Sequence, residues 1–149
     1  MGVWGVLTAD GVSVAFLPAG RTTGASHAAL VRRYYGSWAA DCAAVLHDGE
    51  RALHGPEPMS AYQTVGVTCL TFPPYSPDLN PIENLWSLLD RRLEVTKPRG
   101  WEREKAFRRR VRNAVTWLNS RRRMLKRMVS SMPRRVECLR TAKGAMTPY

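Results

Sequence analysis

The stretch PPYSPDLNPIENLW, residues 73–86, decides the fold because it marks where a strand stops and a long helix begins. Asn80 is a residue type that caps helix N-termini, and Pro81 suits the first helical position. Glu83 follows the cap by three residues, as in a capping box. The pattern predicts a helix from Pro81 with Glu83 at the edge of its buried face. The apolar residues that recur at helical spacing are Ile82, Leu85, Trp86, Leu89 and Leu93.

Upstream of this stretch, the sequence alternates predicted strands with a predicted helix. Residues 3–8 and 12–17 are apolar and β-branched on either side of an Asp-Gly turn, which predicts a β-hairpin. Residues 26–40 have helical periodicity, and residues 43–46 and 65–72 have the composition of strands. Strands interspersed with helices indicate an α/β fold.

Two carboxylates stand at the ends of these elements. Asp48 follows one predicted strand, and Glu83 lies in the first turn of a helix that follows another, with 34 residues between them. Open α/β sheets bind ligands at such strand ends, and Mg²⁺ takes one or two carboxylates beside substrate phosphates. Two such ions can activate a water and stabilise the leaving oxygen in phosphodiester cleavage. On composition and spacing alone a structural interpretation is favoured, in which Glu83 only completes a capping box and Asp48 only forms a turn with Gly49.

The charge of the chain is concentrated at one end. The 149 residues include 23 Lys and Arg and 12 Asp and Glu, a net charge of +11. Residues 1–90 carry four arginines and eight acids (−4), whereas residues 91–149 carry nineteen basic residues and four acids (+15). A basic segment of this kind favours a polyanionic partner, and nucleic acid over a solvated helix face, which usually mixes both signs.

The basic segment is predicted to be helical. One helix is expected to begin near Trp101, to break at Asn119-Ser120, and to be followed by a helix that starts after Ser131 and stops at Gly144. Aromatic residues among arginines can stack on bases, but the helical spacing of Phe107 and Trp117 favours places in the core. The apolar side of the first of these helices carries Phe107, Val111, Ala114, Val115 and Leu118.

Several classes of protein are disfavoured by composition. No apolar run approaches the roughly 20 residues of a membrane-spanning helix, so no membrane partner is expected. The first residues carry no basic segment before their apolar stretch, unlike a secretory signal. The three cysteines are far apart and odd in number, which favours reduced thiols in an intracellular protein over a disulfide framework or a zinc site.

Three segments resemble one protein family. The block SPDLNPIENLW, residues 76–86, resembles the signature around the third catalytic carboxylate of mariner-superfamily DDE transposases, and the spacing of Asp48 and Glu83 meets the spacing of that family. VWGVLTADGVSVAFLPAG, residues 3–20, resembles the hairpin after the first catalytic strand of the family. VSSMPRRVECLRTAKGAMTPY, residues 129–149, resembles its C-terminal ending.

The resemblance implies a fold and a chemistry. The fold is expected to be ribonuclease H-like, an α/β mixed sheet flanked by helices, with a basic helical C-terminal region. Mg²⁺ or Mn²⁺ is held by three carboxylates in the family, and the motif assigns Asp48 as the second and Glu83 as the third, both catalytic and metal-binding. The family hydrolyses DNA at transposon ends and then joins a 3′ hydroxyl to target DNA.

The chain also departs from the family pattern. The family has its first catalytic Asp on a strand before residues 3–8, and a helix-turn-helix region before that, so we expect an N-terminally truncated domain that lacks its first strand and is inactive. The family usually has a His five residues after the second Asp, where this chain has Leu53, followed by His54. His47 stands where Gln is common, and the role of His54 is left open.

These observations predict a transposase/endonuclease catalytic-domain fragment, with residues 1–97 as a partial core and residues 98–149 as its basic extension. Two alternatives remain: a non-catalytic remnant that binds DNA without sequence preference, and an inert product without a stable fold. DNA is the expected partner, a homodimer is expected by analogy with the family, and residues 121–127 suit a nuclear localisation signal, so the nucleus is the expected location. The predicted DNA-binding residues are Arg103, Arg108, Arg109, Arg110, Arg112, Arg121, Arg122, Arg123, Lys126 and Arg127.

Overall fold

Two units of the chain each pack around their own buried side chains. The structure is a computed structural model of the 149 residues. One unit combines Met1–Pro18 with Pro81–Tyr149, and the other is Ala19–Asn80. The residues that the structure describes are 1–17, 20, 22–38, 42, 44–47, 53–73, 76–142, 145 and 147–148.

The first unit opens with an antiparallel hairpin. Strand β1 (Gly2–Leu7) pairs with β2 (Val12–Leu17), so that Leu7 faces Val12 across the turn. The Thr8 hydroxyl accepts hydrogen bonds of 3.2 Å from two backbone amides of the turn, those of residues 10 and 11. The predicted hairpin is therefore confirmed, with a tight turn that is held locally by the Thr8 side chain.

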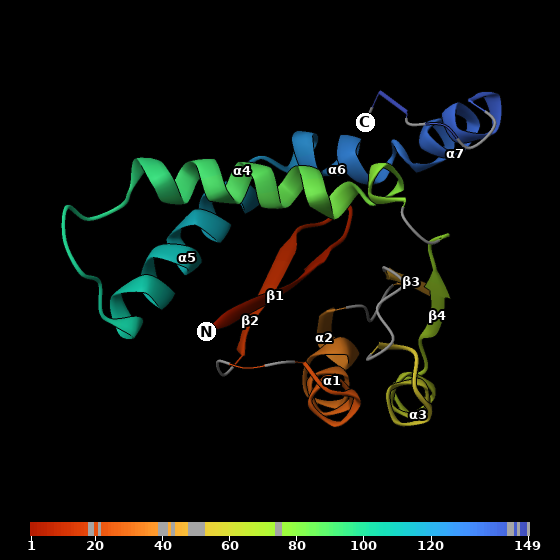
Figure 1. Ribbon diagram of the computed structural model, residues 1–149, viewed down its shortest axis with the longest axis horizontal. Helices are drawn as coiled ribbons and strands as arrows, with labels where there is room; N and C mark the ends of the chain where they lie inside the picture. Colours follow the sequence, from red (N-terminus) through yellow and green to blue (C-terminus); the bar gives the residue numbers. More distant parts are fainter. Residues whose placement is uncertain are drawn as a thin grey trace. The chain divides into compact units, whose positions relative to one another are not determined.

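In the part of this unit that the structure describes, four helices follow the hairpin (Figure 1). They are α4 (Pro81–Val95), α5 (Glu104–Asn119), α6 (Arg122–Val129) and α7 (Met132–Thr141). The helix predicted from Pro81 is confirmed, as is the break at Asn119-Ser120. The next helix begins at Glu104 and not at Trp101, and Gly144, the predicted stop of the last helix, lies outside the described residues.

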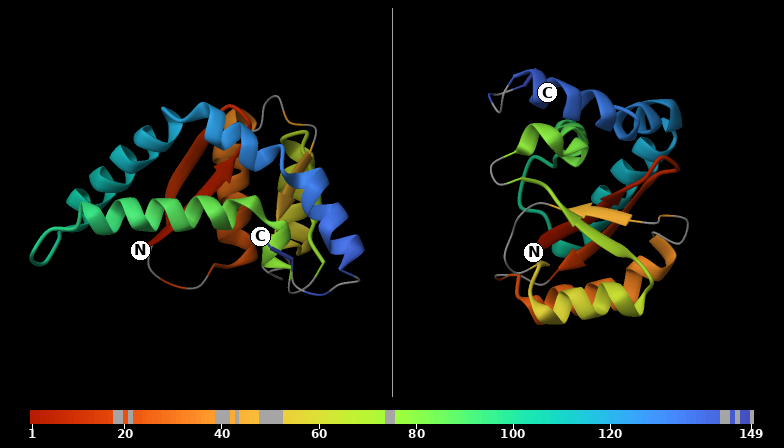
Figure 2. Two further views of the ribbon diagram at one scale, coloured as in Figure 1. Left: turned by 90° about the horizontal axis from the view of Figure 1, so that it is seen from above. Right: turned by 90° about the vertical axis from the view of Figure 1, so that its right-hand side faces the viewer.

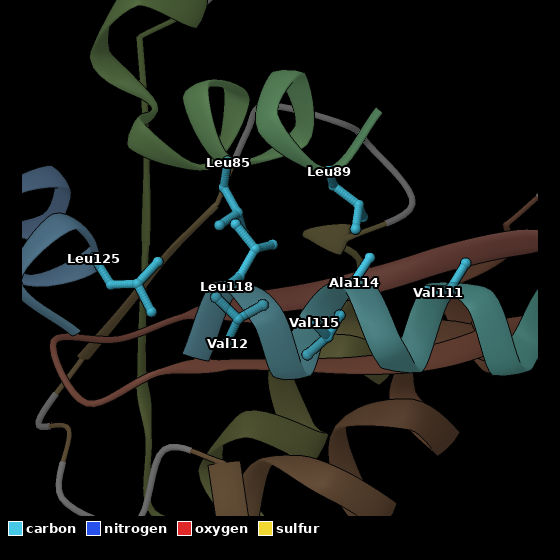
Figure 3. Close-up of a cluster of buried hydrophobic side chains, with 8 residues drawn as sticks. All are labelled: Val12, Leu85, Leu89, Val111, Ala114, Val115, Leu118 and Leu125. Carbon is cyan, nitrogen blue, oxygen red and sulfur yellow. The ribbon is translucent and has the colours of Figure 1, made fainter. Parts of the chain in front are cut away.

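The helices α4, α5 and α6 bury aliphatic side chains against the hairpin (Figure 3). Leu85 and Leu89 supply the α4 side of this cluster, and the other members of the predicted stripe pack around them half-buried. Each fully buried leucine contributes about 1.5–3 kcal/mol relative to an exposed one. The eight buried residues are Val12, Leu85, Leu89, Val111, Ala114, Val115, Leu118 and Leu125.

Two close contacts fix the hairpin on the helices. A Cβ atom at Gly5 would lie 2.5 Å from Cη2 of Trp86, so only glycine permits this approach of β1 to the α4 indole. The Asn119 side chain accepts a 2.7 Å hydrogen bond from the Val12 amide and donates one of 3.0 Å to the Val12 carbonyl. The C-terminal end of α5 is thus tied to the start of β2.

The second unit contains a short parallel pair of strands. Strand β3 (Ala44–His47) pairs with β4 (Thr68–Thr71), and Leu46 faces Leu70 in the register. Helix α3 (Pro56–Thr64) lies between them in sequence, as a parallel pair requires a crossover. The strand predicted over residues 65–72 is confirmed only for Thr68–Thr71. It begins late because the chain turns at Gly66, whose φ of +72° favours glycine.

Helix α1 (Gly24–Leu30) continues through a π-helical segment (Val31–Tyr35) into α2 (Gly36–Trp38). A capping box between Thr23 and Ser26 begins it. Helices α1 and α3 pack side by side (Figure 2), and a 3₁₀ turn (Pro77–Leu79) ends the unit. The predicted helix over 26–40 is confirmed as far as residue 38. Among the described residues, no helix is long and apolar enough to cross a membrane.

Candidate functional site

Glu83 lies in the first turn of α4, with its side chain exposed to solvent. The chain enters the helix through Asn80, which is extended (φ −94°, ψ 102°), and Pro81 is the first helical residue. The Glu83 carboxylate forms no ion pair with any residue that the structure describes, and it stands at the positive end of the helix dipole. Its oxygens are therefore accessible to a cation or to solvent.

Asp48, the other predicted metal ligand, lies outside the described residues. Strand β3 ends at His47, directly before it in the chain. Within the described part of the chain, no three His, Cys, Asp or Glu side chains come together in a way that could hold a metal ion. Of the two predicted ligands, only Glu83 lies among the described residues. Its carboxylate is a hard oxygen donor of the type that Mg²⁺ and Mn²⁺ accept.

A buried cluster of histidines and a tyrosine lies at the end of β3. The Tyr62 hydroxyl from α3 is hydrogen-bonded to Nε2 of His47, and it lies 3.0 Å from Nε2 of His27 on α1. The hydroxyl can donate or accept in each of these contacts, depending on which tautomer the histidine ring adopts. His54, whose role the sequence left open, has its ring centroid 5.4 Å from that of His47.

This environment keeps His47 neutral. Burial, with the nearby His27 and His54 as lesser causes, lowers the pKa of His47 from 6.5 to about 3. Burial also raises the pKa of Tyr62 well above its ordinary value, so the hydroxyl keeps its proton. The end of β3 is therefore held by a neutral His47 that is hydrogen-bonded to the Tyr62 hydroxyl. Sequence reasoning missed His27 and Tyr62, because nothing in their local spacing indicates that they meet His47.

A buried arginine contacts the residue next to Glu83. Arg135 on α7 is 3% exposed, and its guanidinium donates hydrogen bonds to Asn84 Oδ1 and, through Nε at 2.9 Å, to Ser131 Oγ. The first turn of α4 is thereby tied to α7. Sequence reasoning did not assign Arg135 a role, although the Ser-Met-Pro-Arg-Arg run that contains it was one of the segments that carried the resemblance.

The predicted DNA-binding residues fall into two groups. Two are half-buried and engaged within the protein: Arg108 pairs with Glu104 at 2.6 Å, and Arg110 with Glu102 at 2.6 Å. The others have exposed side chains on α5, on α6 or at the ends of these helices. These are Arg103, Arg109, Arg112, Arg121, Arg122, Arg123, Lys126 and Arg127.

Aromatic rings hold several guanidinium groups of the basic segment in place. The Cζ atom of Arg121 lies 3.6 Å from the centroid of the Trp117 ring, and that of Arg92 lies 5.1 Å from it. The Phe107 and Trp117 side chains are half-buried against the aliphatic cluster, as their helical spacing predicted. Trp117 therefore serves as packing and as a platform for cations, which orders part of the basic surface.

Comparisons with known proteins cover most of the chain. A family model described as DDE superfamily endonuclease matches residues 3–107. Over 83 residues, the chain is 35% identical to the transposable element Tcb1 transposase of Caenorhabditis briggsae, which covers 56% of this chain and 29% of that protein. Over 90 residues, it is 36% identical to the transposable element Tc1 transposase of Caenorhabditis elegans, and this match covers 60% of this chain and 31% of that protein. The chain thus spans about three tenths of the length of these relatives.

Solved structures agree on the fold. The catalytic domain of Mos1 mariner transposase matches with a TM-score of 0.76 at 16% identity, over 97% of this chain and 74% of that one. A Mos1 mariner paired end complex with Mn matches with a TM-score of 0.77 at 15% identity, over 97% of this chain and 44% of that one. The predicted ribonuclease H-like α/β class is confirmed by this likeness.

Proposed function

The chain belongs to the DDE superfamily endonucleases of the mariner/Tc1 transposase type, and from this membership we propose that it forms part of the catalytic domain of a DNA transposase. The reaction proposed is hydrolysis of a phosphodiester bond at a transposon end, followed by attack of the 3′ hydroxyl on target DNA. The observation that carries the proposal is the exposed carboxylate of Glu83 in the first turn of α4, within the segment that matches the family.

Asp48 and Glu83 are proposed to hold the divalent metal ion, Mg²⁺ or Mn²⁺. The exposed Glu83 carboxylate fits such an ion by its chemistry and its access to solvent. A bound ion supplies an activated water and charge stabilisation at the leaving oxygen. The protein's own contribution is to orient the ligands. The Arg135–Asn84 contact holds the turn that bears Glu83, and the His27–Tyr62–His47 array holds the end of the strand that precedes Asp48.

Metal affinity tests the two ligands without an activity assay. Binding of Mn²⁺, followed by electron paramagnetic resonance, is expected to weaken in Asp48→Asn and in Glu83→Gln. Glu94→Gln is the matched control, because Glu94 is an exposed carboxylate near the other end of the same helix. Equal affinity of the Glu83 and Glu94 variants would contradict the assignment of Glu83.

The 149 residues on their own are proposed to be inactive. The family resemblance assigns three catalytic carboxylates and places two of them, Asp48 and Glu83, within these residues. Supercoiled plasmid incubated with the purified chain and Mg²⁺ is expected to remain uncut. Metal-dependent nicking that Asp48→Asn abolishes would show that the two carboxylates suffice.

A second candidate function is DNA binding without catalysis and without sequence preference. Eight predicted DNA-binding residues expose their side chains on α5, on α6 or at the ends of these helices, which supports this candidate. Phosphate contacts release counterions, so affinity for duplex DNA should fall steeply with salt and should not depend on Mg²⁺. Duplex binding that requires Mg²⁺, or that ignores salt, would argue against it.

A homodimer and a nuclear location are also proposed, by analogy with the family and from the basic run at residues 121–127. Sedimentation of the chain with and without DNA tests the first proposal. A reporter fused to residues 121–127, compared with the same fusion carrying Arg122→Ala and Arg123→Ala, tests the second.

A further inference from the structure

A pocket of about 650 Å³ lies between the end of α4, the loop that follows it, and α5. The loop joins the two helices within one unit of the chain (Figure 1). Small side chains of α5, Ala106 and Ala114, line part of the pocket and leave room in it. The charged lining residues are four arginines and one carboxylate: Arg92, Arg103, Arg109, Arg110 and Glu102.

The single carboxylate of the pocket is already neutralised. Glu102 accepts hydrogen bonds from Arg110 Nε at 3.0 Å and from Nη2 at 2.6 Å, and both side chains are 16% exposed. The remaining guanidinium nitrogen of Arg110 donates a 2.6 Å hydrogen bond to the carbonyl of Leu93 on α4. Glu102 and Arg110 therefore form part of the pocket wall, where Arg110 joins α5 to the end of α4. Because their charges cancel, the net charge of the pocket comes from Arg92, Arg103 and Arg109.

The other arginines give the pocket a positive charge that is available to a ligand. Arg103 and Arg109 are exposed, and neither forms an ion pair with a residue that the structure describes. The Arg92 guanidinium lies 5.1 Å from the Trp117 ring, which orients it without cancelling its charge. The ligand that this lining favours is an anion.

The pocket also presents a flat aromatic surface. Trp101 is 85% exposed, whereas the other four tryptophans, Trp4, Trp38, Trp86 and Trp117, are all half-buried. Covering the exposed face of this indole with another apolar surface would remove it from water, which is favourable. A ligand with a planar face as well as a negative charge would satisfy both features of the pocket.

We infer that this pocket binds one unpaired nucleotide of single-stranded DNA, with its base stacked on Trp101 and its phosphate held by Arg103 and Arg109. A nucleotide combines a planar base with an anionic phosphate. Inside a duplex both faces of each base are covered by its neighbours, whereas an unpaired base can offer a face to the indole at any position along the strand. The inference rests on the proposed interaction with DNA and adds to it the form of DNA that this site selects.

Binding of a fluorescently labelled oligothymidylate, compared with a duplex of equal length, tests the site in the full chain. Trp101→Ala is expected to weaken oligothymidylate binding about 10-fold, as for loss of one stacked base. Duplex binding should change less than twofold, and Trp101→Phe should keep most of the single-strand affinity. Val95→Ala is the matched control, because Val95 is also an exposed apolar residue (79%) but does not line the pocket.

The charge is tested in the same way. Arg109→Ala should weaken oligothymidylate binding more than Arg127→Ala, which removes an exposed arginine of α6 outside the pocket. The site is refuted if Trp101→Ala leaves single-strand affinity unchanged, if it weakens both forms of DNA equally, or if the two arginine variants behave alike. Single-strand binding that depends on Trp101, without any duplex binding, would uphold the pocket and refute the proposed duplex interface.

Discussion

The two units of the chain stabilise their interiors in different ways. The unit of the hairpin and α4 to α7 contains a cluster of eight buried aliphatic side chains, and this cluster has no polar member. The unit of α1 to β4 buries two histidines and a tyrosine hydroxyl that bind one another. Aliphatic packing is non-directional, and the stability lost on truncating a side chain increases with the volume of the cavity that is left. A buried hydrogen-bonded array is destabilised when one partner is removed, because the remaining polar groups have neither that partner nor water to bond to.

The largest effect is expected in the aliphatic core. Leu118→Ala should lower the free energy of unfolding by about 3 kcal/mol, since Leu118 is fully buried and its removal leaves a cavity. Urea denaturation measures the loss, and hydrogen exchange should place it in peptides of the hairpin, α4 and α5. Val95→Ala, at a 79% exposed position of α4, should change stability by less than about 0.5 kcal/mol.

The next effect is expected in the polar array. Tyr62→Phe keeps the ring and removes the hydroxyl shared by His27 and His47, which should cost about 2 kcal/mol because two buried nitrogens lose a partner. Faster hydrogen exchange should be confined to α1, α3 and the β3–β4 pair. Tyr34→Phe is the control, because Tyr34 is half-buried and stacks on Trp38. Equal effects of the two substitutions would show that the shared hydroxyl is not what stabilises this unit.

The same array should make stability depend on pH. The folded chain holds the pKa of His47 near 3, whereas the unfolded chain has the ordinary value of 6.5. Between these values the unfolded state binds the additional proton, so stability is complete above pH 6.5 and falls as the pH drops towards 3. The slope is at most about 1.4 kcal/mol per pH unit from this one group. Denaturation in metal-free buffer from pH 7 to pH 4.5 measures it, and His47→Gln should remove that part of the slope.

The smallest effect is expected at the polar tie of the aliphatic unit. Asn119→Ala removes both hydrogen bonds to the Val12 backbone and should cost about 1 kcal/mol. Asn113→Ala, an exposed asparagine of the same helix, controls for the change in helix propensity. A loss at Asn119 as large as at Leu118 would show that the aliphatic unit, too, depends on directional bonding.

Much of the fold could be predicted from the sequence because its signals are local. The hairpin depends on a turn held by Thr8, and α4 begins where Pro81 follows an extended Asn80. The apolar period of α4 correctly predicted that Leu85 and Leu89 would be buried. The helix α5 was predicted to begin near Trp101, but it begins three residues later at Glu104, and Trp101 is exposed. Glu83 could be chosen as a candidate from its motif alone.

The remaining features arise from residues that are distant in sequence. His27 and Tyr62 are 35 positions apart, and Asn84 and Arg135 are 51 apart, so no periodicity could pair them. Arg109 and Arg110 are neighbours with the same chemistry, yet only Arg110 is engaged with Glu102 and the end of α4. The sequence by itself determined the elements, the helix start that carries Glu83 and the location of the basic segment, because turns, caps and apolar periods act within a few residues. Only the tertiary structure decided which of the polar side chains meet and which remain free to bind a partner, because packing brings distant helices together.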